Sequence, residues 1–214
     1  MIALYILLGL LALIVVLLAV CTVRAAMLKP TAALTATPPK ADPDLAKAYG
    51  EKLSAMVKQE TVSSRFDPDR SKFRRFQETL PVLFPHVFEK CEIAHPGEGL
   101  VIYYKAKHPS GKEPILLMSH HDVVAAPAEG WEHAPFSGDI DQEGRVWGRG
   151  TVDTKGSLMC EIQALEELLA NGWEPETDVY ITSSCTEEWS GDSAPSIVAW
   201  LKERKVHLGM LMDE

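Results

Sequence analysis

Residue types that bind metal ions or move protons follow several stretches of this sequence that are expected to form β-strands. In an open α/β sheet a ligand site lies beyond the carboxyl ends of the strands, where such side chains meet at one edge. A His-x-Asp turn or a Glu-Glu pair by itself is more often a hydrogen-bonded turn or a solvated helix start. Four such groups at successive strand ends instead predict a metal site: His120-His121-Asp122, Gly148 to Asp153, Glu187-Glu188 and Asp213-Glu214.

The first two groups predict metal ligands with different tasks. His120, fixed at a strand end, can offer one ring nitrogen to zinc, while Asp122 accepts a hydrogen bond from the other nitrogen. Asp153 lies on a Gly-rich loop in which Gly148 and Gly150 let the backbone approach closely. A single carboxylate there is suited to bridge two metal ions roughly 3.5–4 Å apart, the spacing of two-metal hydrolases.

The third group, Glu187-Glu188, is expected to divide its work between metal and proton. Adjacent carboxylates cannot both easily face one ion, and we assign Glu188 to the metal and Glu187 to the general base. His121 is expected to point away from His120 because side chains alternate along a strand, and it is treated as a non-ligand. His133 is expected to be a loop residue.

The elements that must position these residues follow from hydrophobic periodicity. Pro81 and Pro85 must kink or interrupt the second expected helix. The alternation of strands with helices implies crossovers, and hence an α/β fold with a mostly parallel sheet covered by helices on both faces. The expected helices are 44–59, 68–90, 155–171 and 193–203, and the expected strands are 100–106, 114–119, 178–184 and 208–212.

The charge and cysteine content of the chain exclude some classes of function. The formal net charge is −9, whereas binding phosphates requires clustered Lys and Arg, and no nucleic-acid partner is expected. The four cysteines show no C-x-x-C spacing, which fits neither a disulfide framework nor a thiolate zinc site.

The chain begins with an apolar run from Met1 to Val23, and about 20 such residues suffice to cross a bilayer. We expect a transmembrane anchor at 1–23, because no Lys or Arg precedes the run and it exceeds the roughly 7–15 apolar residues of a signal peptide. A signal sequence is the alternative. Residues 24–43, rich in Pro, Ala and Thr, predict a linker to a domain over 44–214. The sequence does not decide on which side of the membrane this domain lies.

The chemistry-bearing segments together resemble the M20 metallopeptidases. The similarity runs from about Asp44 to Glu214 and is greatest to the branch that holds carboxypeptidase S, aminoacylase-like enzymes and secreted N-acyl amino acid hydrolases. It rests on the order and spacing of five segments: His120 to Val124, Trp131 to Phe136, Gly148 to Gly156, Glu187-Glu188 and Leu211 to Glu214.

This resemblance implies a role for each group. His120 and Asp213 would bind one zinc ion and Glu188 the other. Asp153 would bridge the two ions, and Glu187 would activate the shared water. The cofactors implied are two Zn²⁺ ions, or other divalent metals such as Co²⁺. The substrates implied are short peptides or N-acyl amino acids.

Two points stay open at the C-terminal end of the sequence. Asp213 could exchange roles with Glu214, although the family pattern favours Asp213. M20 enzymes also continue with a lid and dimerisation domain and a final zinc-binding histidine. The 214 residues are therefore expected to be the N-terminal part of such an enzyme, inactive alone, while the full-length protein would form a homodimer. The alternative is a catalytically incompetent fragment or a membrane-tethered binding module that keeps the fold.

Overall fold

The structure is a computed structural model that describes residues 1–28 and 42–214. The chain divides into two compact units, Met1–Ala41 and Asp42–Glu214. In the first unit, helix α1 (Ile2–Ala26) is apolar along its whole length and has no buried residue. It is long and apolar enough to cross a membrane, a test that a signal sequence near the N-terminus also passes. Most of the expected linker at 24–43 lies outside the described residues.

The second unit begins with a capped helix, α2 (Pro43–Val57). The Asp42 side chain accepts hydrogen bonds from the backbone N–H groups of Asp44 and Leu45, at 2.9 and 3.3 Å, which are the donors that an N-cap satisfies. The remaining helices are α3 (Ser71–Leu83), α4 (Pro85–Lys90), α5 (Lys155–Ala170) and α6 (Ser193–Glu203). The strands are β1 (Glu92–Ala94), β2 (Leu100–Tyr104), β3 (Ile115–His120), β4 (Val179–Ser184) and β5 (Met210–Asp213), with 3-10 turns η2 (Pro96–Glu98) and η3 (Glu187–Trp189).

Most expected elements are present, and two differ. The expected helix at 68–90 is divided into α3 and α4 at Phe84, because Pro85 cannot donate the hydrogen bond that would continue the first helix. Pro81 is instead accommodated inside α3. Strand β1 was not expected, since its three residues are too short to show a periodic pattern.

Within the described residues the strands form one sheet in the order β1-β2-β4-β3-β5. Strand β3 pairs in parallel with β4 on one side and β5 on the other, whereas β2 pairs antiparallel with β4, and β1 with β2. Parallel pairing needs a long crossover, which α5 and α6 supply; no helix separates β2 from β3 along the chain. The expected α/β fold is therefore present, but the sheet is mixed rather than mostly parallel, because the helix–strand alternation did not indicate the antiparallel pairing of β1 with β2 and of β2 with β4.

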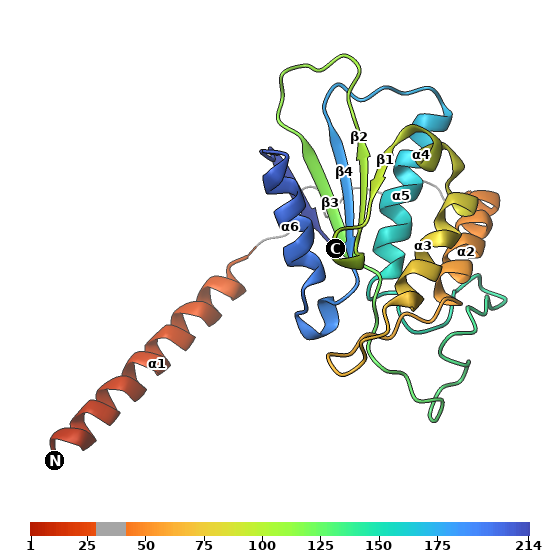
Figure 1. The fold of residues 1–214 in the computed structure, drawn as a ribbon. Helices are drawn as coiled ribbons and strands as arrows, with labels where there is room; N and C mark the ends of the chain where they lie inside the picture. The colour runs from red at the N-terminus through yellow and green to blue at the C-terminus, as the bar shows by residue number, and fades with distance from the viewer. Residues whose placement is uncertain (29–41) are drawn as a thin grey trace. The chain divides into compact units, whose positions relative to one another are not determined.

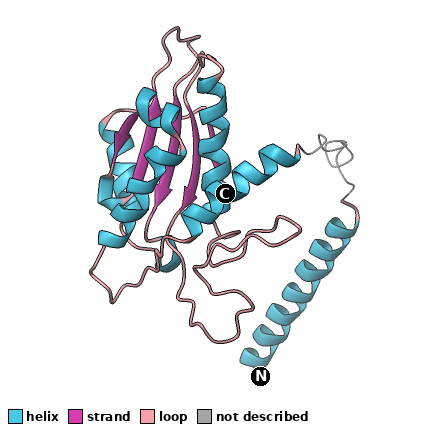
Figure 2. Ribbon diagram, turned by 90° about the vertical axis from the view of Figure 1, so that its right-hand side faces the viewer, coloured by secondary structure: helices cyan, strands magenta, loops and turns pink. Residues whose placement is uncertain are grey.

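Helices cover both faces of this sheet, with α6 on one face and α2, α3 and α5 on the other (Figures 1 and 2). Alternate residues of β3 point to opposite faces: Leu117 packs into the larger core, and Leu116 packs with Ile197 of α6. Helix α5 follows β3 on one face of the sheet and α6 follows β4 on the other, and the connections therefore diverge to opposite faces between β3 and β4. That is where a ligand crevice forms in open α/β sheets.

The Gly148 position shows how tightly the loop before Asp153 is packed. Its φ is +147°, and a Cβ atom there would lie 2.4 Å from Val57 Cγ1 and 3.0 Å from the Pro135 carbonyl oxygen. Val57 is fully buried and the second contact is backbone, and neither can move aside without cost. The sequence predicted that the backbone at Gly148 approaches a neighbouring group closely. In the structure these neighbours are Val57 of α2 and Pro135 of the preceding loop.

Gly148→Ala is therefore expected to lower the free energy of unfolding by about 2 kcal/mol or more, through both backbone strain and overpacking. Gly144→Ala is the matched control, because Gly144 also has a positive φ, +80°, but has nothing within 4 Å of its Cβ position. Urea denaturation of the two variants measures the difference. Equal unfolding midpoints would show that the contacts with Val57 and Pro135 are unimportant.

Candidate active site

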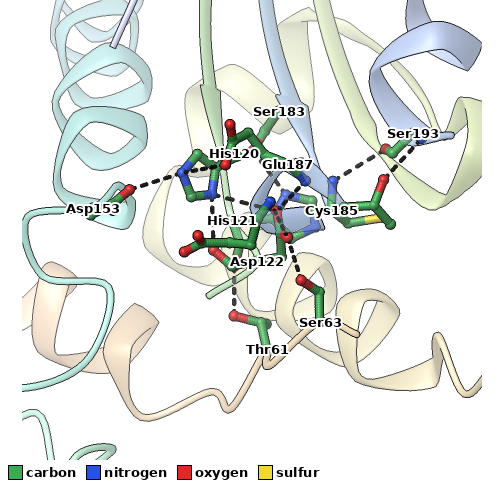
Figure 3. A network of polar contacts seen from close by, with 12 residues as sticks. Thr61, Ser63, His120, His121, Asp122, Asp153, Ser183, Cys185, Glu187 and Ser193 are labelled. Carbon is green, nitrogen blue, oxygen red and sulfur yellow. Dashed lines mark hydrogen bonds and ion pairs between the residues drawn. The ribbon is translucent and has the colours of Figure 1, made fainter. Parts of the chain in front are cut away.

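His120, at the end of β3, directs one edge of its ring at a group of carboxylates. The residue is only 2% exposed. Its Nε2 lies 3.0 Å from Asp153 Oδ1 and 3.7 Å from Glu187 Oε2 (Figure 3). The same nitrogen lies 3.9 Å from Glu214 Oε1. The parallel register explains the convergence, because it pairs His120 with Ser184 at the end of β4, just before Glu187.

Three residues of this group could hold one metal ion together. His120, Asp153 and Glu188 each offer a ligand atom, and these atoms all lie within 4.8 Å of one another. One imidazole nitrogen and two carboxylate oxygens form a donor set that suits zinc. Burial, and then the negative charge of Asp153, raise the pKa of Glu188, which the His120 ring acts to lower, and further positive charge at the cluster would stabilise the ionised carboxylate. A divalent cation would supply that charge.

The protonation of His120 points to the same requirement. Burial acts to lower its pKa, but the hydrogen bond and charge of Asp122 and the charge of Glu214 together raise the pKa to about 9. In the absence of metal, the ring is thus expected to carry a proton on the side that faces the carboxylates. A metal ion would have to displace this proton, since only neutral histidine binds metal.

The opposite ring nitrogen of His120 is held by Asp122, as the sequence indicated, but mainly through its backbone. Nδ1 lies 2.9 Å from the carbonyl oxygen of Asp122 and 3.4 Å from its Oδ1. Both atoms accept from an Nδ1–H group, and they therefore favour the tautomer that leaves Nε2 free for a metal. Asp122 thus orients His120 and contacts its ring from the side away from Asp153.

The carboxylate of Asp122 has a second task that the sequence did not reveal. Oδ1 accepts a hydrogen bond from the backbone N–H of Glu187 at 3.1 Å, and Oδ2 accepts from the N–H of Glu188 at 3.2 Å and from Ser63 Oγ at 2.6 Å. Asp122 is fully buried. Burial acts to raise its pKa, but the hydrogen bonds from His120 and Ser63 outweigh it, and the pKa lies below its usual value.

His121 and His133 lie outside the cluster, as the sequence analysis expected. His121 is fully buried, stacks on Phe76 with ring centroids 5.0 Å apart, and has Nδ1 2.8 Å from Ser183 Oγ. His133 lies in the loop before Gly148, where it stacks on Trp147. Alternation along β3 separates His120 from His121: the first ring faces the carboxylates and the second fills the core.

At the end of β5 the structure brings Glu214, rather than Asp213, toward His120. Asp213 pairs with Met118 in the parallel register, and among the described residues neither Asp213 nor Glu214 belongs to the three-residue group that could hold a metal. The backbone N–H of Glu214 donates to Met118 O at 2.9 Å, and its carboxylate is the one that lies 3.9 Å from His120 Nε2. The geometry thus favours the exchange of roles that the sequence left open.

Lys155, the first residue of α5, ties the loop that carries Asp153 to the preceding part of the chain, and its backbone N–H donates to Gly150 O at 2.9 Å. It is fully buried, and its Nζ donates to the carbonyl oxygens of Met56 at 3.2 Å and Gln59 at 2.6 Å. Burial lowers its pKa to about 7. The lysine belongs to the quoted Gly148 to Gly156 motif, but its contact with the end of α2 could not be read from the sequence.

The burial of His121 predicts a pH dependence of stability. Its pKa falls to about 3, well below the value near 6.5 of an unfolded histidine. Between these pH values the unfolded chain binds a proton that the folded chain excludes, and the free energy of unfolding falls as the pH is lowered through this window. We expect His121→Phe to reduce that slope by up to about 1.4 kcal/mol per pH unit.

Urea denaturation from pH 7 to pH 4 measures the slope. His207→Phe is the control, because His207 is exposed. An unchanged slope in His121→Phe, or an NMR titration of the His121 ring near pH 6.5, would contradict the buried neutral state.

Comparison with known proteins matches the site to one family. The model described as Peptidase family M20/M25/M40 matches residues 116–214, which include every group of the candidate site. The N-fatty-acyl-amino acid synthase/hydrolase PM20D1 of Mus musculus is 37% identical over 173 residues, covering 78% of this chain and 34% of that protein. Carboxypeptidase S of Saccharomyces cerevisiae is 35% identical over 176 residues, covering 76% of this chain and 30% of that protein. The chain spans about a third of the length of these curated relatives.

Solved structures agree on the fold. Human carnosine dipeptidase 1 superposes with a TM-score of 0.64 at 18% identity, over 80% of this chain and 39% of that one. An M20 family metallo-carboxypeptidase from Sulfolobus solfataricus gives a TM-score of 0.56 at 21% identity, over 81% of this chain and 37% of that one. The resemblance seen in the sequence is confirmed, and the chain belongs to the M20/M25/M40 peptidase family.

Proposed function

We propose that this chain carries the metal-binding part of a zinc-dependent hydrolase that cleaves amide bonds in short peptides or N-acyl amino acids. The observation that carries the proposal is the convergence of His120, Asp153 and Glu188 ligand atoms within 4.8 Å, with Glu187 beside them. The names of the relatives support the substrate class, since one acts on N-fatty-acyl amino acids and another is a carboxypeptidase.

The ligand assignment follows the strand ends. His120, Asp153, Glu188 and one of the pair Asp213 and Glu214 would hold two Zn²⁺ ions, or Co²⁺ in their place, with Asp153 between them. When bound, such ions lower the pKa of a shared water and polarise a substrate carbonyl.

Glu187 is the residue placed to move protons. Its side chain is about half exposed, and its Oε2 lies 3.7 Å from His120 Nε2. It can therefore reach both the cluster and a substrate from the solvent side. We assign to it the removal of a proton from the attacking water and the return of that proton to the leaving amine. Asp122 acts behind it by holding the backbone of η3 in place.

The wider architecture remains a set of proposals. A membrane anchor at 1–23 and a linker at 24–43 are proposed from the composition of the sequence. The N-terminal portion of a catalytic domain at 44–214 and a homodimer of the full-length protein are proposed from the family resemblance. The rival function is a catalytically incompetent fragment or a membrane-tethered binding module that keeps the metal site but does not hydrolyse amides.

Glu187→Gln and Glu188→Gln separate the base from the ligand. We expect Glu187→Gln to lower the rate of amide hydrolysis by about 10²- to 10⁴-fold while zinc still binds, because only proton transfer is lost. We expect Glu188→Gln to weaken zinc binding itself. Hydrolysis of an N-acyl amino acid is measured on the longest protein that the gene encodes, and zinc by calorimetric titration.

Glu203→Gln, at the exposed end of α6, is the control for these two substitutions. A wild-type protein that binds zinc but does not hydrolyse amides would favour the binding module. The same titration decides between Asp213→Asn and Glu214→Gln. Because Glu214 lies nearer His120, we expect Glu214→Gln to lower zinc affinity more. The reverse order would restore Asp213 as the ligand.

The proposed anchor predicts that the protein stays in the membrane pellet after an alkaline wash and that a variant without residues 1–28 is released. Helix α1 is long and apolar enough to hold the chain in a bilayer. N-terminal sequencing of the mature protein provides the second measurement. A mature chain that has lost α1 would establish the signal-sequence alternative.

A further inference from the structure

The segment Thr61–Ser63, between α2 and α3, runs beside the residues that follow β3. Val62 and Val123 form an isolated parallel bridge. The backbone N–H of Val123 donates to Thr61 O at 3.1 Å, and the N–H of Ser63 donates to Val123 O at 3.0 Å. Thr61 Oγ1 also donates to the carbonyl oxygen of His121 at 2.5 Å. The two segments are therefore fixed relative to each other on either side of Asp122.

This pairing places the Ser63 hydroxyl directly on the buried carboxylate of Asp122. Ser63 Oγ donates to Asp122 Oδ2 at 2.6 Å, a short distance typical of a bond to an ionised acceptor (Figure 3). The same oxygen accepts from the N–H of Glu188, and the other oxygen accepts from the N–H of Glu187. Each carboxylate oxygen is thus tied to the turn that carries the proposed base and ligand.

The rotation of a carboxylate about its terminal bond is only weakly restricted by its own rotamer preference. The orientation of Asp122 must therefore be set by its hydrogen-bond donors. Two of these, the N–H groups of Glu187 and Glu188, belong to the site itself and would move with it. Ser63 is the donor that comes from outside the site, on the segment between α2 and α3, and its backbone bond to Val123 and the Val62–Val123 bridge hold it beside Asp122.

We propose that Ser63 is a positioning residue of the metal centre, acting through Asp122 on the His120 ring and on the backbone of Glu187 and Glu188. The proposal rests on the metal site described under the proposed function, but not on hydrolysis. Ser63 touches no metal-ligating atom, and its effect must pass through the Asp122 carboxylate. A hydroxyl that served stability alone would leave metal affinity and the resonances of η3 unchanged.

Three variants of the full chain test this role. Ser63→Ala removes the hydroxyl, and Ser63→Thr keeps it. Ser64→Ala removes the neighbouring hydroxyl, which within the described residues accepts only a local bond from the Phe66 N–H. The first readout is the dissociation constant and visible spectrum of bound Co²⁺. The second is the position of the Glu187 and Glu188 amide resonances in the metal-free chain, which requires neither metal nor activity.

We expect Ser63→Ala to weaken Co²⁺ binding about 3- to 10-fold, less than the roughly 10- to 100-fold typical of a group bonded directly to a metal ligand. The Co²⁺ spectrum and both amide resonances should shift in Ser63→Ala. Ser63→Thr should restore them, and Ser64→Ala should leave them unchanged.

Wild-type Co²⁺ affinity and unshifted amide resonances in a folded Ser63→Ala protein would overturn the proposal. If Ser63→Ala does not fold, Ser63→Thr decides: wild-type values in both readouts support the role, and loss of Co²⁺ affinity with the hydroxyl retained overturns it. A wild-type chain that binds Co²⁺ without hydrolysing amides would refute the proposed function alone. If wild-type does not bind Co²⁺, the amide resonances still decide whether Ser63 positions η3.

Discussion

The fully buried carboxylate of Asp122 is the group on which the geometry of this site depends. It receives hydrogen bonds from the backbone of η3 and from Ser63, and it lies beside the Nδ1 atom of His120. An ionised carboxylate without such partners would be very costly in the protein interior, and removal of one partner of a buried pair typically costs about 3–5 kcal/mol. The fold must therefore deliver these donors together, and this requirement fixes the positions of β3, η3 and the segment before α3 relative to one another.

Charge gives the site its second constraint. On the solvent side of His120, the carboxylates of Asp153, Glu187 and Glu214 lie within 4 Å of one ring nitrogen, and Glu188 completes the cluster. Burial and mutual repulsion raise the pKa of Glu188, and in the metal-free state a proton on His120 is favoured instead. A site that concentrates negative charge around a single imidazole is arranged to receive a cation. On the inner side, in contrast, the ionised carboxylate of Asp122 is stabilised by the hydrogen bonds that it accepts.

Helix α2 and the segment between α2 and α3 hold the site in place, together with the sheet. Lys155 joins the start of α5 to the end of α2, and Gly148 lets the preceding loop pass against Val57. The segment after α2 then continues to Ser63 and Asp122. Helices α2 and α3 thus do more than cover one face of the sheet, because the chain between them braces both the metal-binding loop and the strand end.

The sequence by itself determined the α/β class, most helices and strands, and the groups that gather at the strand ends. It could do so because hydrophobic period and residue type are local properties, and parallel strands bring their carboxyl ends to one edge. It also separated His120 from His121, since alternation along a strand is local.

Only the tertiary structure decided the contacts between segments far apart in the chain: Ser63 with Asp122, Lys155 with the end of α2, Glu214 rather than Asp213 beside His120, and the antiparallel pairing of β2. These depend on register and on the direction of side chains at element ends, where periodicity stops and long-range packing sets the geometry.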